Sequence, residues 1–203
     1  MAYLFHIKIK KIMIYPFGGV SKFDMPYNIS PYKEFLILIM GPFFQIIGFR
    51  ILCLIDQNIE LVRLYHYVLL VFNLLPIYPL DGGKLLKIIF DFYLPYKQSL
   101  QLIIYISFCI IIISFLKINP FQGNHLFIGF LLMSSLIKER NKIKIIYDKF
   151  LLERYLYQYR FYKVKKIEDK DYFYRNRYHL IKRKGNWMSE KTFLQTLFQQ
   201  KEL

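Results

Sequence analysis

Long apolar runs fill the first two thirds of the chain and are separated by short polar segments. Crossing the hydrocarbon core of a membrane takes ~20 mostly apolar residues in one helix. Four runs approach that length: Phe35–Ile55, Leu64–Leu80, Leu100–Leu116 and Asn124–Ile137. The pattern predicts a mainly α, polytopic membrane protein with four crossings.

Other segments alternate polar and apolar residues, which predicts strands. Ile7–Tyr15 is such a segment, and the Pro-Phe-Gly-Gly sequence that follows it, ending in Gly18 and Gly19, is expected to form a turn. Near the C-terminus, Tyr178–Lys184 predicts a strand and Ser189–Phe198 a helix with Ser189 at its N-cap. The C-terminal part is therefore expected to be a small α+β unit.

Composition and charge support a membrane protein with a cytoplasmic tail. Hydrophobic residues make up 55% of the 203 residues, with a mean hydropathy of +0.26, whereas soluble domains average roughly 45–50% apolar. The net charge of +15 is uneven: residues 1–137 carry 11 Lys/Arg against 6 Asp/Glu, and residues 138–203 carry 18 against 8. Because Lys and Arg collect on the cytoplasmic side of membranes, we expect a membrane-embedded region over 1–137 and a basic cytoplasmic tail over 138–203.

Aromatic and basic side chains interleave in the tail at Tyr155–Tyr162. Such segments can bind single-stranded nucleic acid. They also suit the cytoplasmic membrane surface, where aromatic residues anchor and basic residues meet anionic lipid. After four apolar runs the second interpretation is favoured, so membrane lipid is an expected partner and nucleic acid is not.

The segment from Asn73 to Gly83 carries the candidate chemistry. Pro76 and Pro79 break the helix and free backbone carbonyls, which is tolerated at membrane depth only against protein or a water-filled cavity. A carboxylate beside such a break needs a partner, commonly a cation. Asp81 is therefore a candidate metal ligand or proton carrier, or alternatively the N-cap of a helix over Gly82–Leu94. Gly82 and the glycine after it would allow another backbone to approach closely.

Four segments, in order, resemble the site-2 proteases, which are zinc intramembrane metalloproteases, and in particular their sporulation type. They are Ile7–Gly19, Lys33–Pro42 (with Met40 where the family has Ala), Asn73–Gly83 and Phe150–Tyr155. The resemblance implies a Zn²⁺ cofactor with Asp81 as its third protein ligand. It implies that Asn73, Pro76 and Pro79 open a path for water and substrate. It also implies that the Gly18–Gly19 strand end lies at the membrane surface near the active site, and that the tail is a shortened CBS-like module.

The family's His-Glu-x-x-His motif, which supplies two zinc ligands and the catalytic glutamate, is missing from this sequence. By the resemblance it should end a few residues before Met1, so we expect an N-terminally truncated member without proteolytic activity of its own. None of the four histidines forms a one-turn pair, and each is expected to be structural or interfacial: His6, His66, His125 and His179.

The resemblance also implies a biological setting. It suggests cleavage of a pro-sigma-K-like protein, control by membrane inhibitor or regulator proteins, and residence in the bacterial inner membrane that surrounds the forespore. Two other function classes stay open: a non-catalytic membrane scaffold or pseudoprotease, and a small transporter with a broken-helix site.

Overall fold

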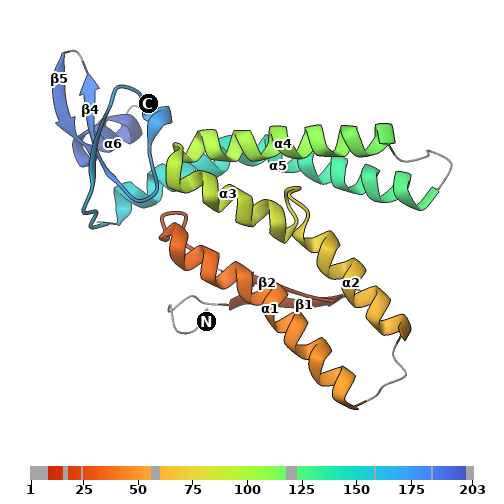
Figure 1. The fold of residues 1–203 in the computed structure, drawn as a ribbon. Helices are drawn as coiled ribbons and strands as arrows, with labels where there is room; N and C mark the ends of the chain where they lie inside the picture. Colours follow the sequence, from red (N-terminus) through yellow and green to blue (C-terminus); the bar gives the residue numbers. More distant parts are fainter. Residues whose placement is uncertain are drawn as a thin grey trace.

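The computed structural model describes residues 9–15, 18–23, 25–55, 60–117, 123–157, 159–183 and 185–199, and it is mostly helical (Figure 1). Six α-helices are present in these ranges: α1 (Pro31–Ile55), α2 (Glu60–Leu74), α3 (Asp81–Tyr93), α4 (Tyr96–Lys117), α5 (Gly123–Leu156) and α6 (Glu190–Gln199). A short 3₁₀ helix, η2, covers Lys170–Tyr172. The strands are β1 (Ile9–Tyr15), β2 (Gly18–Phe23), β3 (Val164–Ile167), β4 (Tyr178–Arg183) and β5 (Asn186–Ser189).

Within the described ranges, α1 and α4 are the helices long and apolar enough to cross a membrane. Much of their apolar surface is not buried by the rest of the chain: Leu54 in α1 is 86% exposed and Leu116 in α4 is 81% exposed. Helices that face lipid need no protein cover for such side chains. The exposure therefore agrees with a membrane environment for these two helices.

The other two predicted crossings take a different form. The run Leu64–Leu80 is not one helix, since α2 ends at Leu74, ahead of Pro76, which has no backbone N–H to continue the helical ladder. The run Asn124–Ile137 is the first part of α5, which continues through the basic residues to Leu156. A continuous helix thus crosses residue 137, where the sequence predicted a boundary between a membrane-embedded region and a tail.

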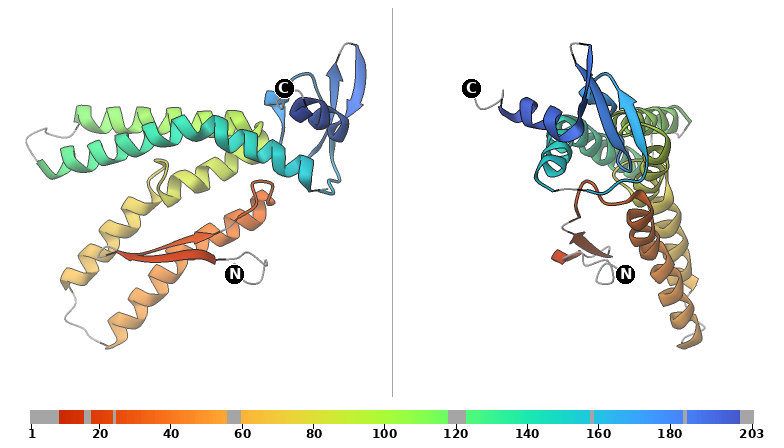
Figure 2. Two further views of the ribbon diagram at one scale, coloured as in Figure 1. Left: turned by 180° about the vertical axis from the view of Figure 1, so that it is seen from behind. Right: turned by 90° about the vertical axis from the view of Figure 1, so that its left-hand side faces the viewer.

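Helices α4 and α5 lie side by side, with α3 packed against α4 and with α1 packed against α3 (Figures 1 and 2). Buried side chains from the segment before α3 and from both long helices form one core: Ile77, Ile103, Ile104, Ile111 and Leu136. This core holds the segment between α2 and α3 against the α4–α5 pair.

The C-terminal residues form a small module at one end of α4 and α5 (Figure 1). Its sheet has the order β3-β4-β5, in which β3 and β4 are parallel and β5 is antiparallel to β4. The prediction of a strand at 178 and a helix after Ser189 is confirmed, and the N–H of Thr192 donates to the Ser189 Oγ at 3.2 Å as a cap requires. A second core ties the module to the start of α4 and the end of α5: Tyr96, Phe150, Phe173, Ile181 and Leu194 are among its buried members.

Near the N-terminus, β1 and β2 form an antiparallel hairpin in which Tyr15 pairs with Gly18 and Ile14 with Gly19. The hairpin lies on the α1 side of the molecule, away from α4 and α5 (Figures 1 and 2). The expected turn residues between the strands, Pro16 and Phe17, fall outside the described ranges.

Candidate functional site

The break between α2 and α3 is an ordered segment anchored to α4. Two short backbone hydrogen bonds shape it, from Ile77 N to Leu75 O (2.7 Å) and from Leu80 N to Ile77 O (2.9 Å). The N–H of Tyr78 donates to the Ser107 Oγ of α4 at 2.8 Å, and the Tyr78-Pro79 peptide is cis. The backbone groups that the prolines release are thus partly satisfied by side-chain and local bonds, as an apolar setting demands.

Gly82 and Gly83 are buried where α3 begins against the end of α2 and the break. A Cβ on Gly82 would lie 2.1 Å from the Leu74 carbonyl oxygen, and one on Gly83 would lie 2.5 Å from the carbonyl carbon of Ile77. No side chain fits in that space, so the close backbone approach predicted for Gly82 and its neighbour is confirmed. The two glycines fix where the first turn of α3 lies.

Asp81 is the first residue of α3, and its carboxylate accepts a hydrogen bond from the Lys84 Nζ at 2.9 Å. The side chain is 35% exposed. It faces α1, since a Cβ on Gly41 would lie 4.0 Å from the Asp81 Oδ2. The N-cap position belongs to Leu80, with no side-chain cap hydrogen bond. The alternative prediction that Asp81 caps the helix is therefore wrong, and its carboxylate is held by a flexible lysine.

The other predicted site residues divide into two groups. Pro76 and Pro79 lie in the break with Asp81, and Asn73 lies half-buried in the last turn of α2. Gly18 and Gly19 lie in another element, at the start of β2, where they pair with β1. The structure thus gathers the Asn73–Gly83 residues around one helix break and leaves the hairpin glycines as a separate element.

Zinc in proteins takes three or four ligands from Cys, His, Asp and Glu. No group of three such side chains that could hold a metal ion occurs among the residues that the structure describes. His66 stacks on Phe49 with ring centroids 4.0 Å apart, and His179 is buried in the C-terminal module. His6 and the side chain of His125 fall outside the described set. The described residues do not fit a zinc ion by themselves, because they offer Asp81 without histidine partners.

A buried charge cluster that sequence reasoning missed lies at the other end of α3. The Arg175 guanidinium donates from one nitrogen to Asp91 of α3 at 2.6 Å and to Glu34 of α1 at 2.5 Å, and from the other to the Ile29 carbonyl at 2.9 Å. Lys87 also pairs with Asp91, at 2.8 Å. Burial by itself would lower the pKa of Arg175, but the charges of Glu34 and Asp91 raise it above its usual value. The i, i+4 spacing of Lys87 and Asp91 was the available sequence signal.

A second buried network holds the C-terminal module on α5. Arg154 donates to Glu190 at 2.9 Å and to the Tyr174 carbonyl at 2.5 Å. The His179 Nε2 accepts from the Tyr174 N–H at 3.0 Å, so its Nδ1 carries the proton and donates to the Glu190 Oε2 at 3.0 Å. Burial lowers the pKa of His179 and would raise that of Glu190, but for Glu190 the His179 bond and the Arg154 charge outweigh burial and lower its pKa.

The comparisons with known proteins identify relatives of the chain. No family model matches the chain. Stage IV sporulation protein FB of Bacillus subtilis is 33% identical over 165 residues, which are 76% of this chain and 57% of that protein. A zinc metalloprotease of Methanocaldococcus jannaschii is 30% identical over 106 residues, which are 47% of this chain and 30% of that protein. The chain thus spans little more than half of the first relative and less than a third of the second. By these similarities it belongs to the site-2 protease family of zinc metalloproteases, with a sporulation protein among its homologues.

Proposed function

We propose that this chain is the Asp81-bearing part of a zinc-dependent intramembrane metalloprotease of the sporulation type. The observation that carries the proposal is the position of Asp81. It opens α3 directly after a proline-broken segment, it is partly exposed, and among the described residues its one hydrogen-bond partner is Lys84. A metal ion could replace Lys84 as the partner of this carboxylate with little loss of folding free energy, because a partly exposed ion pair contributes little stability.

In this proposal Asp81 is one zinc ligand, and the two histidine ligands and the catalytic glutamate come from polypeptide outside the described residues. Zinc supplies a bound water of lowered pKa and polarises the scissile carbonyl. The chain's own part is structural: Pro76 and Pro79 break the helix between α2 and α3, Asn73 would border the path of water and substrate, and Gly82 sets the position of the first turn of α3. Alone, the chain is expected to have no peptidase activity.

The wider setting belongs to the same proposal. Four crossings would place Asp81 toward the cytoplasmic end of its helix and the basic tail in the cytoplasm, because Lys and Arg between the apolar runs alternate between high and low counts. A cytoplasmic pro-protein cut near its N-terminal segment, such as a pro-sigma factor, fits that arrangement. Its membrane would be the one around the forespore, where membrane regulators would control it.

The test uses the protein translated from the complete open reading frame. We expect an in-frame His-Glu-x-x-His upstream of Met1, zinc bound in a one-to-one ratio, and loss of both zinc and substrate cleavage in Asp81→Asn. Asp169→Asn, which removes an exposed carboxylate from the C-terminal module, is the matched control and should retain both. An Asp81→Asn protein that keeps zinc and activity would refute the role of Asp81.

A non-catalytic scaffold is the second candidate, favoured by the lack of a complete ligand set in the described ranges. The upstream reading frame separates the two. A stop codon, or open frame without the histidine motif, would leave the scaffold as the function of this chain.

A further inference from the structure

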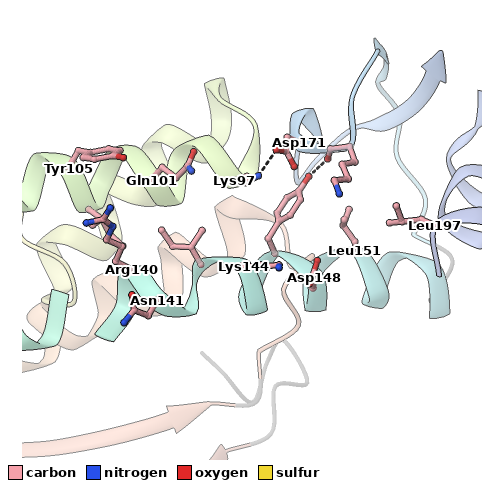
Figure 3. Close-up of a pocket in the computed structure, with 14 residues that line it drawn as sticks. Lys97, Gln101, Tyr105, Arg140, Asn141, Lys144, Asp148, Leu151, Asp171 and Leu197 are labelled. Atoms are coloured by element: carbon pink, nitrogen blue, oxygen red, sulfur yellow. Dashed lines mark hydrogen bonds and ion pairs between the residues drawn. The ribbon is translucent and has the colours of Figure 1, made fainter. Parts of the chain in front are cut away.

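A cavity of about 380 Å³ lies where α4 and α5 meet the C-terminal module. It is separate from the Asp81 site and is lined from α4, α5, η2 and α6 (Figure 3). Its volume falls in the range of about 300–1,000 Å³ typical of small-molecule sites. Nothing in the proposed protease chemistry uses it.

The cavity wall is cationic. It contains four basic side chains, Lys97, Arg140, Lys144 and Lys170, against the two acids Asp148 and Asp171. Lys97 is held in an ion pair with Asp171. Across the described ranges no hydrogen bond or ion pair engages Arg140 or Lys144, which are one helical turn apart on α5 and line the same cavity. Asp148 lies beside Lys144 (Figure 3), but with Lys97 paired to Asp171 the wall keeps a net positive charge, which favours an anion.

The rest of the lining suits a phosphate ester with an apolar part. Gln101 of α4 and Asn141 of α5 also line the cavity and carry amide N–H donors (Figure 3). Ile104, Leu151 and Leu197 supply apolar surface in the same cavity. A phosphate oxygen can take several N–H donors at once, and Arg provides a planar pair of them.

With α4 as a membrane span, the cavity would lie at the level of the lipid headgroups. On α4 it uses the first turns of the membrane-length helix, from Lys97 to Tyr105. On α5 it begins at Arg140, three residues after the end of the apolar run at Ile137. The surface of the α4–α5 pair therefore changes from apolar to basic where the cavity begins. Anionic lipids bind in basic pockets between helices at that boundary.

We propose that this cavity binds a phosphate group through Arg140 and Lys144, and that an anionic phospholipid of the surrounding leaflet presents it. The acyl chains would lie along the exposed apolar surface of α4 and α5, while the phosphate reaches the two cations. A bound lipid would join the membrane helices to the C-terminal module, since the cavity wall includes residues of both. The proposal does not depend on zinc or on Asp81.

The test measures lipid retention by the full chain purified in detergent. Native mass spectrometry after exposure to phosphatidylglycerol would give the fraction of protein carrying lipid. Arg140→Gln with Lys144→Gln is expected to weaken retention about tenfold or more, because the charge-assisted hydrogen bonds to the phosphate are lost. The matched control, Lys138→Gln with Lys149→Gln, removes the same charge from exposed positions of α5 outside the cavity and should retain lipid as the unmodified chain does.

A second arm uses glycerol 3-phosphate, which carries the phosphate without acyl chains, in a titration of lipid-free protein. Binding of phosphatidylglycerol that depends on Arg140 and Lys144 supports the site with lipid as the source. Binding of glycerol 3-phosphate alone with the same dependence supports the phosphate site with a soluble source. Equal behaviour of the two double variants toward both probes would overturn the proposal.

Discussion

Arg175 and Asp91 lie 84 positions apart in the sequence, and their side chains meet at 2.6 Å in a fully buried ion pair. Arg175 belongs to the C-terminal module, and Asp91 to the last turns of α3, whose first residue is Asp81. Ten residues of helix separate the two aspartates by about 15 Å. Because Arg175 also binds Glu34 of α1, one guanidinium of the module holds both helices that meet at Asp81.

Replacing Arg175 with Gln should therefore loosen the module and the α1–α3 pair together. Removing one partner of a buried ion pair leaves uncompensated charge and typically costs about 3–5 kcal/mol. We expect a lower melting temperature and faster proteolysis of the chain after Phe150, measured in detergent. Arg160→Gln, at an exposed position ahead of β3, is the control for charge loss, and an equal effect of the two variants would contradict the coupling.

The tight start of α3 gives a second prediction. Gly82→Ala places a methyl group 2.1 Å from the Leu74 carbonyl oxygen, so α3 must move away from the end of α2. Overpacking of this kind typically costs about 1–3 kcal/mol, and a melting curve would measure it. Gly48 in α1 has no atom within 4 Å of its ideal Cβ, so Gly48→Ala should leave stability unchanged or raise it by up to about 1 kcal/mol. A Gly82→Ala protein as stable as Gly48→Ala would show that the approach is not as close as the structure has it.

The break around Asp81 could be predicted because its causes are local. Pro76 and Pro79 each lack a backbone N–H, and two of them within four residues interrupt a helix at this point. Gly82 and Gly83 permit close backbone contact because they have no side chain. The strand β4 and the helix α6 could also be predicted from local signals. Alternating polar and apolar residues indicated β4, and the Ser189 cap indicated the start of α6.

The buried charges could not be predicted, since their partners are distant. Glu34 and Arg175 are 141 positions apart, and each alone resembles a solvated surface charge. The extent of α5 was also hidden, because the change from apolar to basic residues at 138 resembles a domain boundary. The helix continues there since Lys, Glu and Arg are good helix formers, and Glu139 pairs with Lys142 one turn on.

Stability of the C-terminal module should fall as the medium is acidified. His179 has a pKa below its ordinary value of 6.5, so the unfolded chain binds a proton more readily than the folded one. Its contribution is complete above pH 6.5 and is lost as the pH falls toward the folded pKa. Glu190 also has a lowered pKa, and it adds a further loss below its ordinary value of 4.5. Both shifts have the same sign, so the two groups destabilise the folded module in the same direction as the pH falls.

Melting temperatures between pH 7.5 and 5 would check this. The unmodified chain is expected to lose stability across that interval, because a proton on the His179 Nε2 would face the Tyr174 N–H that now donates to it. His179→Asn should have a lower melting temperature at pH 7.5, but its melting temperature should change less between pH 7.5 and 5. The control is His66→Gln, which removes a histidine of α2 that stacks on Phe49 of α1. Its melting temperature should depend on pH as steeply as that of the unmodified chain. A slope unchanged in His179→Asn would assign the pH dependence to other groups.

Zinc binding by the isolated 203-residue chain gives the last prediction. Tight zinc sites combine three or four ligands, and their apparent binding free energies of about 10–16 kcal/mol come from the whole set. Asp81, bonded to Lys84 and without histidine neighbours in the described ranges, cannot reach that affinity. Dialysis against micromolar zinc followed by metal analysis should find far less than one equivalent, and a peptidase assay should match the blank.

In this chain alone, Asp81→Asn should therefore bind as little zinc as the unmodified sequence does. The two proteins should differ once the complete reading frame supplies the histidine pair, because a third ligand matters only when the first two are present. That contrast separates a ligand from a structural carboxylate, since loss of a structural role would lower the melting temperature equally in both contexts. One full equivalent of zinc in the isolated chain would mean that residues outside the described set complete the site.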